Sequence, residues 1–169
     1  MRRRHDSGAL AIVLALFLFA KKGRPMTTTT GPAATRTDSN QSSVEAALLE
    51  AGCPLGALKI LTAMSAHETH GWQGGMWNWN VGNVTTASSN YVLQPGLSLH
   101  FATYPSLAAG AKAFVDLLKS DLYAGSIQLA EVGDLAGFVA VLKQGGYAGT
   151  KADYTKYEAA IARWMAQLT

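Results

Sequence analysis

Residues 54–71 constrain the fold more than any other stretch of this 169-residue chain. Apolar side chains at Ala57, Leu61 and Met64 recur with helical spacing, so they share one face of a helix. A proline at its start and a glycine at its end suit the two boundaries. The apolar face continues to Glu68, close to the expected end of the helix. The sequence therefore predicts a buried helix with a carboxyl group in its last turn.

Four further helices are predicted from periodicity and capping residues. Ser42 and Glu45 have the spacing of a capping box, which would start the first helix of the domain. Thr150, with Asp153 three residues later, would start the last one. The four predicted helices cover residues 43–51, 106–123, about 133–144 and about 151–167.

Residues 91–104 have a different pattern. Leu97, Leu99 and Phe101 alternate with polar residues, and a Pro-Gly pair at Pro95 precedes them. Alternation around a turn sequence predicts two short strands. The expected fold class is therefore α+β, a mainly α-helical domain with a small β-hairpin lobe.

The N-terminal residues divide into two segments before the domain at 43–169. Within residues 1–23, thirteen apolar residues lie between basic flanks and would span roughly 20 Å as a helix, less than a bilayer core of roughly 30 Å. We expect an exported chain with a short membrane anchor; a cleaved signal peptide and a buried helix remain alternatives. Residues 24–42, rich in Thr, Ser and Pro, are expected to be a flexible linker.

Charge argues against a nucleic-acid partner, and the cysteine content excludes an intramolecular disulfide. Residues 1–42 carry a net charge of +5, whereas residues 43–169 carry −2. A folded part without basic excess makes nucleic acid an unexpected partner. Cys53 is the single cysteine, which excludes an intramolecular disulfide, and its apolar context favours a buried, inert thiol.

The position of Glu68 predicts unusual acid–base behaviour. Burial on an apolar face disfavours the carboxylate, and so does the negative end of the helix dipole. A carboxyl group that stays protonated near neutral pH can act as a general acid. The simpler interpretation is a solvated glutamate at a helix end.

A tryptophan- and asparagine-rich stretch follows this helix. Indole rings suit the apolar faces of sugars, and side-chain amides suit hydroxyl and acetamido groups. The alternatives are core packing for the tryptophans and turn formation for the asparagines. The candidate sugar-binding residues are Trp72, Trp77, Trp79, Asn78, Asn80 and Asn83.

Three histidines allow a competing hypothesis, a zinc-dependent peptidase. His67 and His70 lie three residues apart, and His100 lies in the predicted hairpin. However, H-E-T-H is not the H-E-x-x-H motif that places two ligands on one helix face. We expect no metal and no other cofactor.

Several segments together resemble one protein family. "AHETHGW" and "NWNVGN" resemble the catalytic-helix region of glucosaminidase-type peptidoglycan hydrolases, found in autolysins and flagellar muramidases. "FATYPSLAAGAKAFVDLL" and "GGYAGTKADYTKYEAAIARWM" resemble the segments that open the family's next helix and close its domain. The resemblance covers about residues 44–168 in the same order.

This resemblance implies a lysozyme-like fold and cleavage of β-1,4 bonds in peptidoglycan. By position, Glu68 would be the general acid and Tyr147 would lie near the scissile sugar. Asn80 and Gly82 would shape the adjacent loop, and Tyr104 would belong to the substrate-binding region. A wall-cleaving protein with a membrane anchor fits a bacterial envelope or a membrane-containing phage virion.

Residues 69–115 contain no Asp or Glu, so the segment after Glu68 lacks the second carboxylate that most glycosidases use, unless a distant one such as Asp116 or Asp153 takes its place. Two mechanisms need only one acid. The 2-acetamido group of the substrate can attack the anomeric carbon, or the muramic acid 6-hydroxyl can close to an anhydro product, as in the related lytic transglycosylases. A non-catalytic peptidoglycan-binding module is the alternative.

Overall fold

The structure is a computed structural model that describes residues 34–73, 76–86, 91–93, 100–149 and 153–169. The described part is mainly helical. Its α-helices are α1 (Gln41–Glu50), α2 (Leu58–Glu68), α3 (Leu107–Lys119), α4 (Ser126–Glu131), α5 (Leu135–Gln144) and α6 (Tyr154–Gln167). The 3-10 turns η1 (Leu55–Ala57) and η2 (Asp121–Tyr123) and the strands β1 (Tyr91–Leu93) and β2 (His100–Ala102) complete it.

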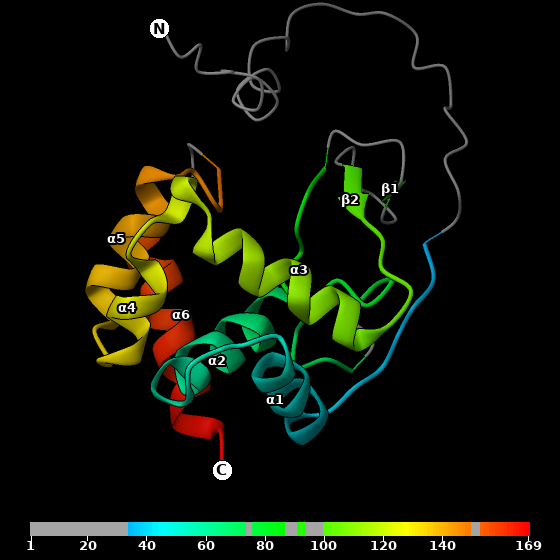
Figure 1. The fold of residues 1–169 in the computed structure, drawn as a ribbon, viewed down its shortest axis with the longest axis horizontal. Coiled ribbons are helices and arrows are strands. Elements are labelled where there is room, and N and C mark those ends of the chain that lie inside the picture. Colours follow the sequence, from blue (N-terminus) through cyan, green and yellow to red (C-terminus); the bar gives the residue numbers. More distant parts are fainter. Residues whose placement is uncertain (1–33, 74–75, 87–90, 94–99, 150–152) are drawn as a thin grey trace, which may run out of the picture.

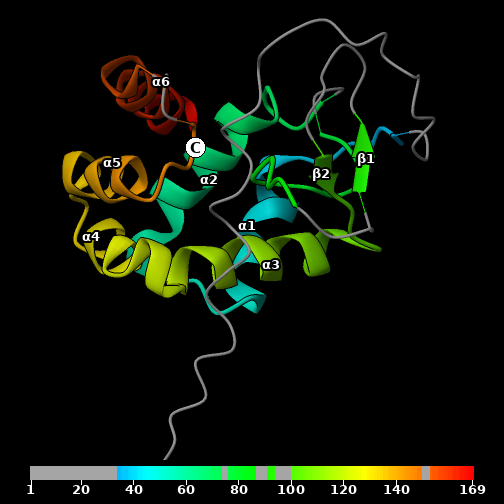
Figure 2. The same ribbon diagram turned by 90° about the horizontal axis from the view of Figure 1, so that it is seen from above.

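Helix α2 lies at the centre of the domain. It packs against α1 and α6 and also contacts α4, and α3 runs past it from the α4 side to the strands (Figures 1 and 2). Every residue from Ile60 to Ala66 is buried, which explains why the apolar pattern of this segment is so marked. The two strands and helices α4 to α6 lie on opposite sides of α2 (Figure 2). Helix α2 therefore lies between the two strands on one side and helices α4 to α6 on the other.

The predicted hairpin is confirmed for its two strands. β1 and β2 are antiparallel, with Val92 opposite Phe101. Phe101 is buried and also forms an isolated bridge with Thr85. Leu97 and Leu99, with the rest of residues 94–99, lie outside the described part.

The prediction of helix starts was wrong at two places. Asn40, not Ser42, caps α1, because its side chain accepts the backbone N–H of Ser43. Asp153, not Thr150, caps α6 by accepting the N–H of Lys156. In both cases an Asn or Asp side chain near the predicted cap is the group that satisfies the free N–H.

Two other helix boundaries were predicted correctly, and one helix was missed. Ser106 caps α3, and α5 ends at Gln144 before a pair of glycines. The short α4 follows Gly125, which has a left-handed backbone conformation (φ 87°) and provides no side-chain cap. A six-residue helix without a capping side chain leaves little pattern in a sequence.

Residues 34–40, which the sequence assigns to the linker, lie on the domain. We call them the N-terminal strap. Their hydrogen bonds go to the stretch 72–79. The bonds are Thr35 N–H to Asn78 Oδ1 (3.0 Å), Asn78 N–H to Thr35 O (2.8 Å), Thr37 N–H to Met76 O (3.1 Å), Ser39 N–H to Trp72 O (3.3 Å) and Trp79 N–H to Thr37 Oγ1 (3.0 Å). The folded unit therefore includes residues that precede position 43.

We expect a variant that begins at residue 34 to be more stable than one that begins at residue 43. The shorter variant lacks the Asn40 cap, worth about 1 kcal/mol, and the strap hydrogen bonds, each worth about 1 kcal/mol. The difference in unfolding free energy should be at least about 2 kcal/mol, measured by urea denaturation. Equal values would mean that the strap is not part of the folded unit.

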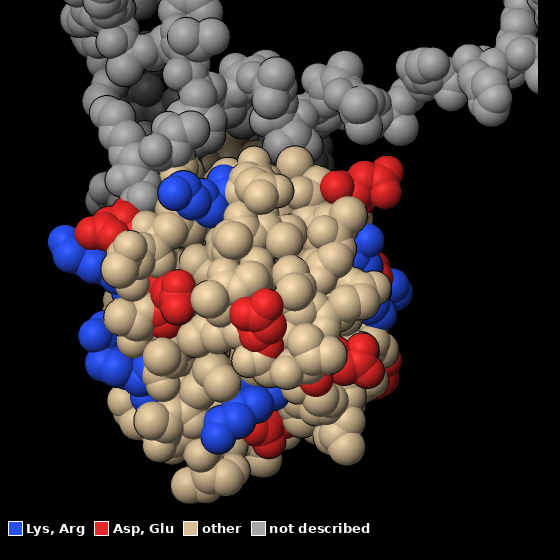
Figure 3. Space-filling view, turned by 90° about the vertical axis from the view of Figure 1, so that its left-hand side faces the viewer, with Lys and Arg blue, Asp and Glu red and all other residues tan. Residues whose placement is uncertain are grey.

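The predicted membrane segment, residues 8–20, lies outside the described residues. Of the helices that the structure describes, none combines the length and the apolar character needed to cross a bilayer. On the face drawn in Figure 3, basic and acidic side chains are interspersed, without a large patch of either sign.

Candidate active site

Glu68 is the last residue of α2, and the chain turns sharply after it. Thr69 caps the helix, and His70 and Gly71 both have left-handed backbone conformations (φ 52° and 79°). The Thr69 hydroxyl donates to the Ser65 carbonyl at 2.7 Å. These contacts fix the end of α2 and thereby the direction in which the Glu68 side chain leaves it.

Glu68 is half-buried, and its carboxyl group is hydrogen-bonded. Its Oε1 accepts a hydrogen bond from the hydroxyl group of Tyr157, on α6, at 2.6 Å. The side-chain amide of Asn83 donates to the Glu68 backbone carbonyl. Burial raises the pKa of Glu68 to about 7, while the hydrogen bonds from Tyr157 and Asn83 oppose the shift. A raised pKa is what the position on an apolar helix face predicts.

Tyr147 lies within electrostatic reach of Glu68. Its hydroxyl donates to the carbonyl of Gly82, and its pKa is raised well above the usual value, first by burial and then by Glu68. A side chain at position 82 would come within 2.4 Å of Phe114 and 2.9 Å of the Tyr147 hydroxyl. Gly82 therefore allows the loop to approach Tyr147 closely.

Asn80 has a structural position, so its assignment as a sugar-binding residue is corrected. It is buried, and its amide donates to the carbonyls of Val84 (2.9 Å) and Ala102 (3.1 Å). Its Oδ1 accepts the N–H of Val84 at 2.8 Å. These bonds tie the loop to β2 and leave Asn80 no surface for a ligand.

Trp72 is also corrected, because it belongs to the hydrophobic core. Its side chain is 5% exposed, and its ring lies 6.4 Å from that of Trp164. The indole N–H donates to the Ser65 hydroxyl at 3.0 Å. Neither the face nor the N–H of this indole is available to a sugar.

The other loop residues form turns and a partly exposed aromatic surface. Asn78, Trp79 and Asn83 have left-handed backbone conformations, and the Asn78 side chain holds the strap. Turn formation therefore accounts for much of the asparagine content. Trp77, Trp79 and Tyr104 are half-buried and so retain surface for a ligand. Arg36 of the strap lies over the Trp77 ring, 5.2 Å from its centre.

Two carboxylates elsewhere in the chain could have replaced the missing second acid. Asp116 is exposed on α3 and paired with Lys112 at 2.7 Å, and Asp153 is exposed and paired with Lys156 at 3.2 Å. Neither contributes to the pKa of Glu68. Both carboxylates are committed to surface ion pairs.

The histidines do not form a metal site in the described part of the chain. No group of three His, Cys, Asp or Glu side chains there could hold a metal ion. His67 instead packs edge-on against the Tyr157 ring at 5.1 Å. Its pKa is lowered, first by burial and then by His70 and Arg163.

Tyr157 was missed by the sequence analysis, although it donates the hydrogen bond to Glu68. It lies 89 residues after the glutamate. Tyr157, Ile161 and Trp164 follow helical spacing on α6. This spacing indicates a buried face, but it does not identify the residue that the hydroxyl contacts.

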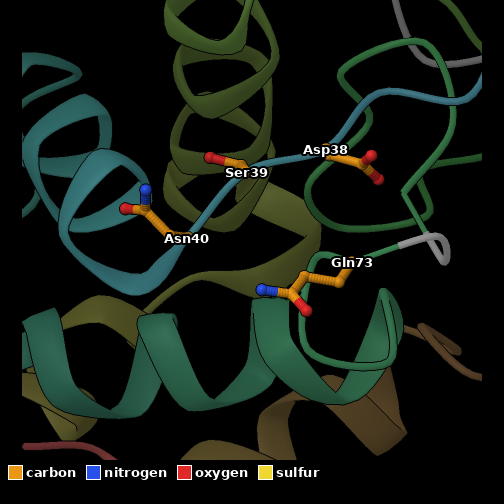
Figure 4. Close-up of a pocket in the computed structure, with 4 residues that line it drawn as sticks. All are labelled: Asp38, Ser39, Asn40 and Gln73. Carbon is orange, nitrogen blue, oxygen red and sulfur yellow. The ribbon is translucent and has the colours of Figure 1, made fainter.

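A shallow polar pocket lies between the strap and the turn after α2 (Figure 4). Its volume is about 400 Å³, and Asp38, Ser39, Asn40 and Gln73 line it. None of these residues was predicted to bind substrate. The pocket does not include Glu68, Tyr147 or Tyr157.

Comparisons with known proteins add no assignment: no family model, no curated protein and no solved structure matches the chain significantly.

Proposed function

We propose that the protein cleaves β-1,4 glycosidic bonds in the glycan strand of peptidoglycan, using Glu68 as its general acid within a lysozyme-like domain. The observation that carries this function is the half-buried carboxyl group of Glu68, which ends α2 beside Tyr157 and Tyr147. With a pKa of about 7, much of this group is protonated at neutral pH. A protonated carboxyl group can give its proton to the oxygen of a breaking glycosidic bond.

The aromatic residues of the loop supply the sugar-binding surface. Trp77 and Trp79 belong to the stretch that follows Glu68, and Tyr104 lies beside this stretch. All three side chains are half-buried. Partly exposed aromatic rings bind the apolar faces of sugar rings, while their polar atoms bond to hydroxyl groups. Asn83, whose side-chain amide already donates to the Glu68 backbone carbonyl, lies beside the acid and remains a proposed binding residue for an acetamido group.

The positive charge of the transition state is met by the substrate itself. No other carboxylate contributes to the pKa of Glu68, so neither a glycosyl ester nor a second base is invoked. In one route the 2-acetamido group attacks the anomeric carbon, and water then opens the oxazolinium ion with retained configuration. In the other, ionised Glu68 takes the proton of the muramic acid 6-hydroxyl, which closes to a 1,6-anhydro product.

Digestion of purified cell walls in H₂¹⁸O, followed by mass spectrometry of the released fragments, tests this function. Fragments with 1,6-anhydromuramic acid ends contain no new oxygen, whereas the acetamido route yields ¹⁸O-labelled reducing ends of retained configuration. A labelled product with inverted configuration would require a second base and would contradict the single-acid mechanism. No fragments at all would favour the alternative, a peptidoglycan-binding module without turnover.

We expect kcat/KM to fall as the pH rises above about 7. Glu68 must be protonated to act as an acid, and its pKa is about 7. Above that value each pH unit should lower kcat/KM about tenfold, because the protonated fraction falls tenfold. Turbidity assays on cell walls between pH 5 and 9 measure this decline. A rate that stays constant up to pH 9 would exclude Glu68 as the acid.

The place of action follows from the substrate. Peptidoglycan lies outside the cytoplasmic membrane, so the chain would be exported, with residues 1–23 as a membrane anchor. Membrane and peptidoglycan are then its partners, in a bacterial envelope or in a membrane-containing phage virion. Fractionation of cells that express the full chain would locate it.

A further inference from the structure

We propose that Tyr157 is a positioning residue that decides which oxygen of Glu68 carries the acidic proton and that supports the carboxylate after the proton has left. This inference rests on the proposed function of Glu68. Its structural basis is the 2.6 Å hydrogen bond from the Tyr157 hydroxyl to Glu68 Oε1, between α6 and the end of α2.

The Tyr157 hydroxyl is held in place from several sides. Its side chain is buried on the face of α6 that packs against α2. The ring of His67 meets it edge-on at 5.1 Å, and the ring of Tyr154 lies at 6.0 Å. Rings fixed by packing cannot turn the hydroxyl away from Glu68 at low cost. The hydrogen bond is therefore present before any substrate arrives.

Tyr157 acts as a donor and does not ionise. Its pKa is raised well above the usual value for tyrosine, first by burial and then by Glu68. A phenol that keeps its proton and directs it at Oε1 leaves Oε2 as the oxygen that carries the proton of the neutral acid. Oε2 is then the atom that meets the glycosidic oxygen.

The same hydrogen bond assists the reaction step. The proton on Oε2 passes to the bridging oxygen as the bond from that oxygen to the anomeric carbon breaks, and Glu68 becomes a carboxylate. A hydrogen bond from a neutral donor becomes stronger when its acceptor gains charge. The carboxylate later takes a proton from the 6-hydroxyl or from water, which restores the acid. Tyr157 thus favours the state that Glu68 must pass through.

Other groups around Glu68 have partners of their own. Tyr147 directs its hydroxyl to Gly82. Asn83 donates to the Glu68 backbone carbonyl, and its side chain, like that of Tyr157, lowers the pKa of the Glu68 carboxyl. His67, which precedes Glu68 on α2, packs against the Tyr157 ring. Tyr154 uses its hydroxyl to accept the N–H of Ala148 at 3.2 Å. Tyr157 is therefore the tyrosine whose removal affects the carboxyl oxygen directly.

The test is the titration of Glu68 by ¹³C NMR of its side-chain carboxyl, assigned by its loss in Glu68→Gln. Tyr157→Phe keeps the ring and removes the donor, so the pKa of Glu68 should rise. The matched control Tyr154→Phe should leave it unchanged. If Tyr157→Phe does not fold, 3-fluorotyrosine at position 157, a stronger donor, should lower the pKa instead. An unchanged titration in the variant that folds would overturn the inference.

Kinetics provide a second readout. In Tyr157→Phe, kcat/KM on cell walls should fall roughly 10- to 100-fold, the range of a hydrogen bond to a charged group, and its decline with pH should begin at a higher pH. A fall in rate without this displacement would indicate a merely structural role. If the wild-type protein cleaves no cell walls, the proposed function fails, while the NMR titration still decides how Tyr157 acts on Glu68.

Discussion

Glu68→Gln should lower kcat/KM for cell-wall cleavage by ~10²–10⁴-fold or more, while the protein stays folded. General acid catalysis contributes ~10²–10⁴-fold, and no second carboxylate that could replace Glu68 contributes to its pKa. The amide can still accept the hydrogen bond from Tyr157, so the packing around α2 and α6 should persist.

The matched controls are Glu50→Gln, which makes the same change at an exposed position of α1, and Asp116→Asn on α3. Both should keep wild-type rates, because Glu50 is exposed and Asp116 is paired with Lys112. Turbidity assays and muropeptide analysis measure all three variants. A Glu68→Gln protein with near-normal turnover would show that another group supplies the proton.

The same substitution should stabilise the protein at alkaline pH. The pKa of Glu68 is about 7 in the folded chain against a reference value of 4.5. The folded state therefore keeps a proton that the unfolded state releases. Wild-type stability falls as the pH rises from about 4.5 to about 7 and then stays level.

The loss amounts to roughly 3 kcal/mol, since each pKa unit corresponds to about 1.4 kcal/mol. The glutamine of Glu68→Gln cannot ionise. The difference in unfolding free energy between this variant and the wild type should therefore be larger at pH 8 than at pH 4 by about this amount. Urea denaturation at the two pH values measures the difference. A Glu68→Gln protein whose unfolding free energy changes with pH as that of the wild type does would mean that Glu68 is solvated.

Local patterns predicted much of the helical framework. The apolar stripe on α2 and the Ser106 cap of α3 depend on neighbours in sequence, and both are present in the structure. The two errors in the predicted N-caps occurred where a second residue that can cap a helix lies nearby. Asn40 and Asp153 satisfy the N–H groups that Ser42 and Thr150 were expected to satisfy. Both caps are contacts across three residues, and in each case two neighbouring residues of a capping type were available in the sequence.

The candidate site was predicted less completely than the fold. The residue type and helix-end position of Glu68 were enough to predict a raised pKa. The surroundings were not predictable in the same way. Trp72 and Trp79 look alike in the sequence, yet Trp72 is buried and gives its N–H to Ser65, whereas Trp79 is half-buried. The α6 residue Trp164 packs against Trp72, and the packing of α6 against α2 also brings Tyr157 to Glu68.

The position of the strap beside the aromatic loop makes it a suitable place for a fluorescent label that reports on this loop. Because Thr35 exchanges hydrogen bonds with Asn78, a fluorophore at position 35 would be adjacent to the loop that carries Trp77 and Trp79. Labelling through a Thr35→Cys substitution would be selective, since burial raises the pKa of the native Cys53 thiol to about 11 and keeps it unreactive. Quenching of that fluorophore by the two indoles would follow the entry of a glycan strand in real time, without any bond being cut.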